Sequence, residues 1–432
     1  MMKFVRYLVA LVALMVATSV GAQSAADSTG EATDGAGAAA EDTGKSAAEG
    51  TGEAADSANA EDVLVVSLIT CYPGQNIYEL YGHTELRVRG SGYDWVFNYG
   101  TFDFRAPNFI YRFVKGETDY MLAGYPSSYM LVGYERRKVV EQVLNLTPSQ
   151  AREVRDALFS GAQPENRTYR YNYVLDNCST RPRDIVEATV GQSLQYPPMP
   201  AGLTFRSMMH HYNANYAWQQ FGIDLALGSG LDYELTPRQE MFAPISLMTA
   251  FDGATIERGG ERVPLVTATT VLNPGSDSGD ILPPTPWYFH PLTLALLLLA
   301  VAVVLSVRDV RRRKVSRWFD SALFGIATLA GVLVAFLVFV STHEATSPNY
   351  NLLWLHPLHI IPAIFVWIKS AKKMVVCYHF ANFAVILLTM ALWALLPQCA
   401  NAAFFPLMAA LAVRSLSFVL TVRRTKGTTV RN

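Results

Sequence analysis

A cysteine at a strand-to-helix junction is the first residue of this sequence that could do covalent chemistry. It lies in YVLDNCSTRPRDIVEATVG, residues 173–191, where an apolar, β-leaning run ends and a helical pattern begins. Asn177 can cap that helix, so the Cys178 thiol would face the helix N-terminus, where the dipole favours a thiolate and lowers the pKa. We therefore predict that Cys178 is a nucleophile.

A thiol nucleophile needs a base, and His83 is the strongest candidate in the same part of the chain. It stands in YGHTELRV at the head of a predicted strand, where an imidazole can project from a sheet edge. The adjacent His210 and His211 cannot both face one site on a helix, so we expect a surface or interface role for them. The next strand, DWVFNYGTFDF, offers Asn98 or Asp103 to orient the imidazole. Asn98 ranks first because its parity in a hairpin could put it on the face of His83.

Cys71 leaves a second interpretation open. The sequence has four cysteines, and Cys71 and Cys178 share the part of the chain that precedes the membrane-like segments. An oxidising compartment would permit a disulfide between them. In that case the domain would be a scaffold and Cys178 would not be a nucleophile.

The elements that must position these residues follow from periodicity and turn chemistry. Four runs rich in β-branched and aromatic residues predict strands, at Val63–Cys71, Glu85–Gly90, Asp94–Gly100 and Tyr169–Val174. Glycines at 90 and 92 predict a hairpin between the second and third strands. Thr147-Pro148-Ser149-Gln150 has the signature of a capped helix start, and Thr236-Pro237-Arg238-Gln239 repeats it. The predicted fold class is an α+β domain with an antiparallel sheet that carries the histidine.

Composition divides the 432-residue chain into an exported half and a membrane half. Charged residues make up 16% and hydrophobic ones 51%, which indicates a membrane part. The net charge of −1 gives no indication of the strongly basic surface that nucleic-acid binding requires. The predicted segments are a signal peptide at 1–22, a disordered acidic low-complexity tether at 23–61, an exported domain at 62–270, a linker at 271–286, a transmembrane domain at 287–422 and a cytoplasmic tail at 423–432.

Apolar runs centred on residues 297, 330, 361, 387 and 410 predict an all-α membrane domain of about five spans. The basic segments 308–317, 369–373 and 423–426 alternate with the less basic segments 343–351 and 398–401. The positive-inside rule then puts the basic loops in the cytoplasm and the soluble half outside. Arg414 lies late in the last run, and we expect it to snorkel to the inner face.

Several further polar residues are candidates for substrate binding. Arg181 and Arg183 could bind a lipid phosphate bidentately, although pairing with Asp184 and its neighbours is an equal alternative. In the membrane half the candidates are His343, Asn351, His356 and His359. No carboxylate accompanies the last two histidines, so we predict no metal site, and we predict no cofactor.

The motifs ITCYPG, YGHTELRV, NYGTFDF, NCSTRPRD and NYNLLWLHPL, taken in order, resemble those of the Lnb-type lipoprotein N-acyltransferases. The resemblance covers roughly residues Val63 to Val422. The order of histidine and then cysteine is also similar to that of circularly permuted papain-like thiol acyltransferases. One of these, lecithin:retinol acyltransferase, carries a second histidine on the neighbouring strand. This chain has none between Asp94 and Phe104.

The resemblance implies a multi-pass protein of the bacterial inner membrane with its catalytic domain on the periplasmic side. It implies acyl transfer through a thioester on Cys178, with His83 as the base. The donor would be a phospholipid or lipoprotein ester, and the acceptor would be the N-terminal amine of a diacylated lipoprotein. Membrane lipids would be partners and nucleic acid would not. Two alternatives stay open, namely a papain-like amidase or peptidase of cell-wall peptide and the disulfide-bonded scaffold.

Overall fold

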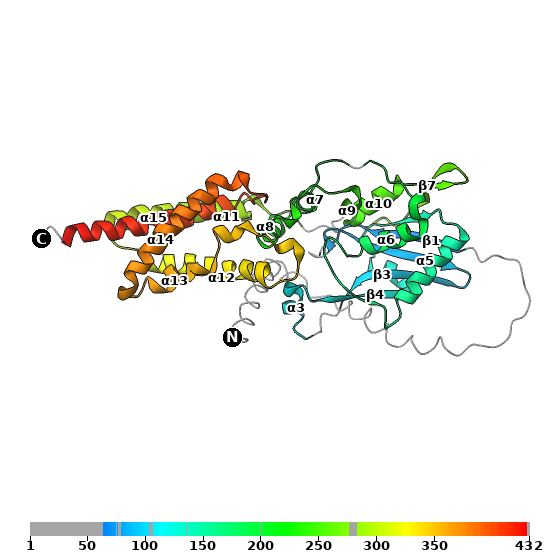
Figure 1. Ribbon diagram of the computed structural model, residues 1–432, viewed down its shortest axis with the longest axis horizontal. Helices are drawn as coiled ribbons and strands as arrows, with labels where there is room; N and C mark the ends of the chain where they lie inside the picture. Colours follow the sequence, from blue (N-terminus) through cyan, green and yellow to red (C-terminus); the bar gives the residue numbers. More distant parts are fainter. Residues whose placement is uncertain are drawn as a thin grey trace, which may run out of the picture. The chain divides into compact units, whose positions relative to one another are not determined.

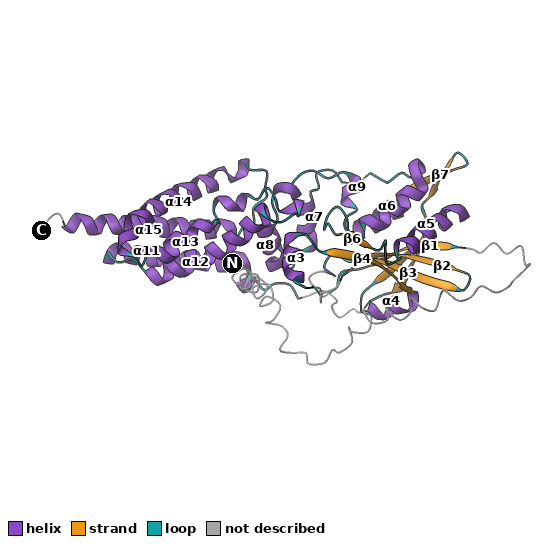
Figure 2. Ribbon diagram, turned by 60° about the horizontal axis from the view of Figure 1, so that its bottom comes forward, coloured by secondary structure: helices purple, strands orange, loops and turns teal. Residues whose placement is uncertain are grey.

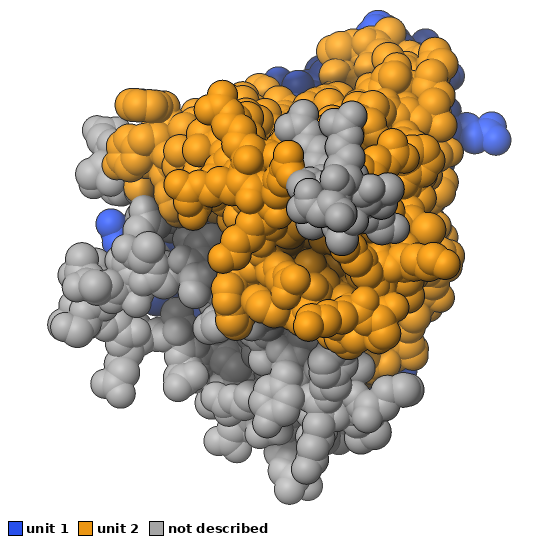
Figure 3. Space-filling view, turned by 90° about the vertical axis from the view of Figure 1, so that its left-hand side faces the viewer, with its two compact units in different colours: residues 1–110, 119–199, 237–281 blue, residues 111–118, 200–236, 282–432 orange. Residues whose placement is uncertain are grey.

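The computed structural model describes residues 64–74, 76, 79–102, 107–134, 136–198, 200–275 and 283–429. They fall into two units, which Figure 3 distinguishes by colour. Unit 1 holds the described residues within 1–110, 119–199 and 237–281, and unit 2 holds those within 111–118, 200–236 and 282–432. The predicted signal peptide, the predicted tether and Asp103 lie outside the described residues.

A seven-stranded antiparallel sheet in the order β6-β4-β3-β2-β1-β5-β9 is the centre of unit 1. Its strands are β1 (Val65–Cys71), β2 (His83–Gly90), β3 (Tyr93–Thr101), β4 (Asp119–Pro126), β5 (Val139–Leu144), β6 (Thr168–Arg170) and β9 (Val266–Asn273). The short strands β7 (Thr255–Arg258) and β8 (Glu261–Pro264) form a separate hairpin. The predicted α+β class is thereby confirmed for this unit.

Three of the predicted strands and the hairpin at residues 90–92 are confirmed, but the fourth strand is wrong over most of its length. Of this run only the residues of β6 form a strand; Asn172 pairs with Asp176 in an isolated bridge, and residues 173–175 between them form a turn. The Asn172 side chain accepts hydrogen bonds from the backbone N–H groups of Val174 and Leu175, at 3.2 Å each. This local turn replaces the ladder bonds that a longer strand would need.

Helices cover both faces of the sheet, and Figure 2 shows α4 on one side and α5 and α6 on the other. The helices of unit 1 are α4 (Ser127–Gly133), α5 (Pro148–Gly161), α6 (Thr180–Val190), η3 (Gly191–Ser193), α9 (Pro237–Glu240) and α10 (Pro244–Asp252). Both halves of the predicted capping box of α5 form between Thr147 and Gln150. The helix predicted after Thr236 has only the four residues of α9.

The main core lies on the α5, α6 and α10 side, where Leu68, Leu86 and Phe97 pack against Leu158 and Leu247. A smaller apolar cluster lies on the α4 side and includes Ile69, Cys71, Val96, Met130 and Val139. Because strand residues alternate between faces, His83, Glu85 and Asn98 share the α4 side with this smaller cluster.

Unit 2 is helical among its described residues, and its long helices run alongside one another in Figure 1. Its elements are α3 (Phe109–Lys115, of which unit 2 holds Tyr111 onwards), α7 (Phe205–Tyr212), α8 (Ala217–Ala226), η4 (Ser229–Leu231), η5 (Trp287–Phe289), α11 (Pro291–Arg312), α12 (Arg317–Phe339), η6 (Glu344–Thr346), η7 (Tyr350–Leu353), η8 (Pro357–His359), α13 (Ile360–Phe365), η9 (Lys369–Ala371), α14 (Lys372–Leu392), η10 (Trp393–Leu395) and α15 (Phe404–Thr429).

Within the described part of the chain, four helices are long and apolar enough to cross a membrane, at Pro291–Arg312, Arg317–Phe339, Lys369–Leu395 and Phe404–Arg423. The fifth predicted span, centred on residue 361, is a series of short helices, η7, η8 and α13, in place of one long helix. The segment still runs the length of α12, because the Thr346 hydroxyl donates to the Leu337 carbonyl oxygen near one end of α12 and the Trp367 indole N–H donates to Ser321 near the other. Pro357 and Pro362 cannot donate helical hydrogen bonds, so this run does not form one long helix.

Arg414 does not reach the inner face as predicted, because its guanidinium is fully buried in the bundle. Its Nε and Nη2 donate to Asp320 at 2.7 and 3.0 Å, and Nη2 also donates to Asp309 at 2.8 Å. The Ser306 hydroxyl accepts from Nη1 at 3.1 Å. The buried charge is therefore retained by partners on α11 and α12.

Replacing Arg414 by methionine is expected to destabilise the membrane domain by about 3–5 kcal/mol, because Asp309 and Asp320 would be left buried without a cation. Thermal unfolding of the detergent-purified protein measures the change. Arg423→Met is the matched control, since the Arg423 side chain is exposed on the same helix. An unchanged unfolding temperature in Arg414→Met would contradict this account of the cluster.

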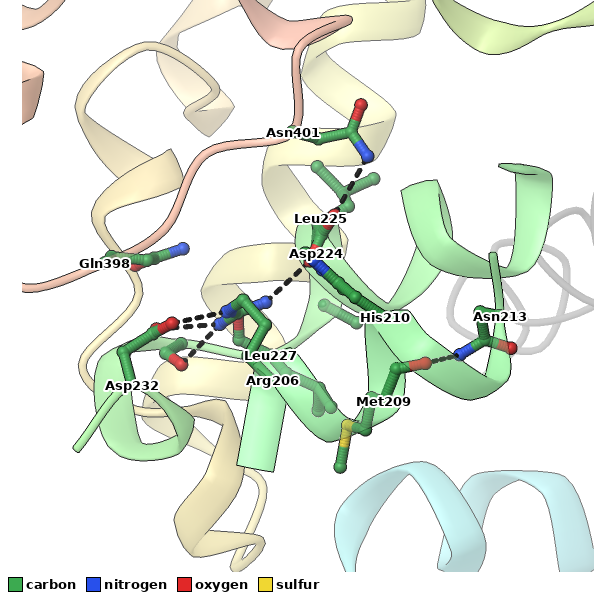
Figure 4. Close-up of polar contacts among 12 residues, drawn as sticks. Arg206, Met209, His210, Asn213, Asp224, Leu225, Leu227, Asp232, Gln398 and Asn401 are labelled. Atoms are coloured by element: carbon green, nitrogen blue, oxygen red, sulfur yellow. Dashed lines mark hydrogen bonds and ion pairs between the residues drawn. The ribbon is translucent and has the colours of Figure 1, made fainter. Parts of the chain in front are cut away.

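A second buried ion cluster holds residues 200–236 within unit 2 (Figure 4). Arg206 donates to Asp224 at 2.9 Å and to Asp232 at 2.7 Å. Asp224 also contacts His210 Nε2 at 2.8 Å and accepts a hydrogen bond from Asn401 at 2.9 Å. His210 thus has the interface role expected for it, in a cluster that joins α7 and α8 to the segment before α15.

Candidate active site

Asn177 lies two residues before the N-cap of α6, Ser179, and its side chain bonds to the first N–H groups of the helix, which fixes the position of Cys178. Its Oδ1 accepts hydrogen bonds from the backbone N–H groups of Ser179 at 2.8 Å and Thr180 at 3.0 Å. Its Nδ2 donates to the carbonyl oxygens of Tyr173 and Phe242, at 2.9 and 3.0 Å. With every polar atom of the amide engaged, the turn that carries Cys178 is held rigidly at the start of the helix.

Cys178 and His83 both lie close to Gly100. A Cβ added to Gly100 would lie 3.4 Å from His83 Cε1 and 3.7 Å from Cys178 Cβ, so both side chains border the same small space. The glycine stands where the β3–β4 register shifts, and its φ of +128° is a conformation that other residues rarely adopt. The bulge and the missing side chain together admit the cysteine and the imidazole.

The imidazole is the first member of a hydrogen-bonded chain along the sheet. His83 Nε2 lies 2.9 Å from Asn98 Oδ1, and Asn98 Nδ2 donates to Glu85 Oε1 at 2.8 Å. Because the carboxylate takes the amide N–H, the Asn98 oxygen faces the ring and Nε2 must carry the proton. Nδ1 is then the unprotonated nitrogen, the one able to accept a proton.

Glu85 is the site residue that the sequence reasoning missed. It is fully buried, and its Oε1 also accepts hydrogen bonds from Tyr125 at 2.6 Å and Tyr134 at 3.1 Å. Burial raises its pKa to about 7, against the lowering effect of those hydrogen bonds. The available signal was an acidic residue at the start of a predicted strand, paired directly with Asn98 in the β2–β3 register.

The resting charge state of Cys178 differs from the thiolate that the helix position predicted. Burial raises the pKa of Cys178 to about 11, and the backbone hydrogen bond from Thr84 only partly opposes it. Burial also lowers the pKa of His83 to about 4, which the hydrogen bond to Asn98 opposes. Desolvation therefore outweighs the helix dipole, and the resting site holds a neutral thiol beside a neutral imidazole.

Cys71 is a free, fully buried cysteine at the end of β1, opposite His83 in the strand register. Cys178 is free as well. The interpretation of a scaffold held by a disulfide between the two has no support in this geometry.

Comparison with known families identifies both halves of the chain. Residues 52–210 match the Lnb N-terminal periplasmic domain, and residues 284–426 match the Lnb transmembrane domain. The chain belongs to the Lnb family. No curated protein and no solved structure matches it. The resemblance to Lnb-type lipoprotein N-acyltransferases is thus confirmed at the level of the family, and the Lnb domains indicate a membrane protein with a periplasmic domain.

The two arginines near the cysteine have different surroundings in this Lnb protein. The Arg183 side chain is buried and donates to Asp184 and to the Arg238 carbonyl oxygen, so the pairing alternative describes it. Arg181 is about one-third exposed, forms a bidentate pair with Asp176 and lies 4.3 Å from the centre of the Tyr169 ring. Arg181 also lines an open cavity of about 540 Å³ between α5 and α6.

Three of the four candidates in the Lnb transmembrane half, His343, Asn351 and His359, form local side-chain hydrogen bonds, and the buried Nδ1 of His356 has no hydrogen-bond partner among the described residues. His343 Nε2 lies 2.8 Å from the Phe113 carbonyl oxygen, and buried Asn351 donates to the Asp224 carbonyl oxygen at 3.0 Å. His356 and His359 stack with ring centres 4.2 Å apart. Across the described residues no group of three or more potential ligands could hold a metal ion.

Proposed function

We propose that this Lnb protein is an acyltransferase that moves a fatty acyl group, through a thioester on Cys178, to the N-terminal amine of bacterial lipoproteins. The observation that carries the proposal is that Cys178 and His83 both border Gly100, within a domain that matches the Lnb periplasmic domain. Asn98 orients the imidazole, and Glu85 holds Asn98.

In the first step the Cys178 thiol gives its proton to His83 Nδ1 as the sulfur attacks the ester carbonyl of the donor. The C–S bond forms and the carbonyl carries a negative charge, which backbone N–H groups at the start of α6 could stabilise. When the C–O bond breaks, the leaving alkoxide takes the proton from the imidazolium. The products are an acyl-thioester and a free hydroxyl on the donor.

In the second step the lipoprotein amine attacks the thioester. His83 Nδ1 accepts a proton from the amine, the C–N bond forms, and the C–S bond breaks. The imidazolium returns the proton to the departing sulfur, which restores the neutral thiol. A covalent intermediate divides a difficult transfer into two easier ones and lets the first product leave before the amine binds.

The substrates follow from this chemistry and from the membrane domain. The donor would be a phospholipid or the lipoprotein's own ester, and the acceptor a diacylated lipoprotein in the bacterial inner membrane, approached from the periplasmic side. Arg181, partly exposed at the edge of a cavity, is the better placed of the two arginines to contact a lipid phosphate.

Trapping the acyl-enzyme tests the proposal. The purified protein is incubated with phospholipid alone, and intact-mass analysis should find one fatty acyl increment that neutral hydroxylamine releases. Adding a diacylated lipopeptide should move the increment to the peptide's α-amine. An adduct formed only with the lipopeptide identifies the lipoprotein's ester as the donor. Cleavage of cell-wall peptide without any acylated enzyme would replace the proposal with the amidase alternative.

Glu85→Gln is expected to slow acyl transfer by about 10–100-fold, the range seen for partners that orient a functional histidine. The variant keeps an oxygen for Asn98 but removes a carboxyl group that titrates near pH 7. The wild-type rate should rise as pH passes through that region because the ionised carboxylate is the stronger acceptor, and the variant's profile should lack this rise. An identical pH profile would show that Glu85 has a structural role only.

A further inference from the structure

The helix α3, which lies in the sequence between the site strands β3 and β4, has an exposed apolar face. Ile110 and Phe113 are one helical turn apart and are 50% and 45% exposed, and Tyr111 is 36% exposed. No side chain of α3 is buried. Large apolar side chains gathered on a short helix indicate a surface that meets something other than water.

The C-terminal end of α3 is held within unit 2 by hydrogen bonds to residues 341–343, which follow the end of α12 in the chain. The Thr342 backbone N–H donates to the Lys115 carbonyl oxygen at 2.8 Å, and the Ser341 hydroxyl donates to the Val114 carbonyl oxygen at 2.9 Å. His343 Nε2 adds its contact with the Phe113 carbonyl oxygen. These bonds satisfy the carbonyl groups that a helix leaves open at its C-terminus.

That attachment sets the level of α3 relative to a bilayer. The membrane span of α12 ends at Phe339, so the bonds begin two residues beyond it, within about 7 Å at the ~3.3–3.6 Å that an extended chain spans per residue. Residues 111–118 also lie within the segment that matches the Lnb periplasmic domain, which makes this the periplasmic end of α12. The helix is therefore held at the outer membrane–water interface.

The apolar face of α3 continues a surface that already faces lipid. At the end of α12, Phe339 is 78% exposed and Val340 is 43% exposed, as side chains that contact acyl chains must be. The Tyr111 ring packs on Phe336 of the same helix, with ring centres 6.1 Å apart. The occupant that covers the end of α12 is the bilayer, and α3 is joined to that end.

We propose that α3 is an interfacial helix whose Ile110 and Phe113 side chains insert into the outer leaflet of the membrane. Its partner is a lipid surface, contacted at the depth of the glycerol esters, about 5–10 Å into the boundary between headgroups and acyl chains. The inference extends the proposed function and rests on it, because it names the surface through which the protein would contact the lipid that supplies the acyl group.

The test uses a fluorescent label and needs no acyl transfer, so its failure is distinct from failure of the proposed function. Cys178, Cys377 and Cys399 are replaced by serine, and buried Cys71 is kept. An environment-sensitive dye is attached at Ile110→Cys in the full chain, reconstituted in vesicles of phosphatidylethanolamine and phosphatidylglycerol. Phe339→Cys is the lipid-exposed control. Val132→Cys, on the similarly short α4 and 72% exposed, is the water-exposed control.

The label at 110 is expected to emit at shorter wavelength than the label at 132. It should be quenched by a doxyl group near the top of the lipid acyl chain more strongly than by one near its end, and it should be protected from aqueous iodide. Iodide quenching equal to that of the label at 132 would overturn the proposal. Protection from iodide without any quenching by doxyl lipid would also overturn it, in favour of a protein that covers the helix.

A functional comparison follows from the same contact. Ile110→Asp should raise the KM for a phospholipid donor in vesicles and leave kcat for a detergent-dispersed short-chain donor unchanged. Val132→Asp should change neither. Equal losses on both donors in Ile110→Asp would point to damage to the fold and would contradict a role in lipid contact.

Discussion

Cys178→Ala is expected to abolish acyl transfer and the acyl-enzyme while the protein still reaches the membrane in folded form. The substitution removes the only atom that can carry the acyl group, so the loss should exceed the ~10²–10⁴-fold that removal of a base costs. Folding should survive because Asn177 retains its four hydrogen bonds, two of them to the first N–H groups of α6. The measurement is intact mass after incubation with phospholipid, beside thermal unfolding of the same sample.

Cys71→Ala is the matched control, because Cys71 is a second free cysteine of the same domain, lies cross-strand from His83 and does not border Gly100. It should keep most of the activity and lose some stability through the small cavity it leaves. Equal loss of activity in the two variants would contradict the nucleophile assignment and restore the disulfide interpretation.

His83→Gln is expected to lower the rate of acyl transfer by about 10²–10⁴-fold, the usual cost of losing a general base. A thiol with a pKa near 11 supplies almost no thiolate at neutral pH, so this site depends strongly on a base. Glutamine keeps a hydrogen bond to Asn98 and should preserve the fold. A near-normal rate of acyl-enzyme formation in His83→Gln would remove the histidine from the mechanism.

The pH dependence of His83 and Glu85 gives this prediction a second readout. The folded-state pKa of His83, about 4, is below its usual 6.5, so its contribution to unfolding free energy is lost as pH falls from 6.5 to 4. The pKa of Glu85, about 7, is above its usual 4.5, so its contribution is lost as pH rises from 4.5 to 7. The two slopes oppose each other in the wild type. Stability should therefore fall with rising pH in His83→Gln and increase with pH in Glu85→Gln.

Local signals predicted the parts of the site that depend on neighbours in sequence. The bonding of Asn177 to the start of α6, the hairpin and the facing of Asn98 toward His83 each follow from a few adjacent residues and from strand parity. The buried environment of Glu85 could not be predicted in that way. Its partners Tyr125 and Tyr134 stand 40 and 49 residues further along the chain, and only the folded sheet and α4 bring them to the carboxylate.

The membrane half shows the same division between composition and structure. Hydropathy identified four long helices because length and apolar content suffice for them. It did not predict that prolines break the run around residue 361 into short helices, and it failed at Arg414, whose partners lie on α11 and α12. Hydropathy also could not predict the close approach of the His356 backbone to α12. A Cβ on Gly331 would come within 2.6 Å of the His356 carbonyl carbon, so that contact depends on a missing side chain.

The neutral state of the resting Cys178 thiol affects how fast this cysteine is oxidised or alkylated outside the cytoplasm. Peroxides, alkylating agents and small disulfides react with the thiolate, and a half-buried cysteine with a pKa of about 11 offers them almost none. The enzyme would thus be slow to oxidise in a compartment that lacks a thiol-reducing buffer, and its sulfur would become reactive only as a carbonyl group and His83 share its proton. We expect the unacylated protein to resist iodoacetamide at neutral pH far longer than a free cysteine in solution.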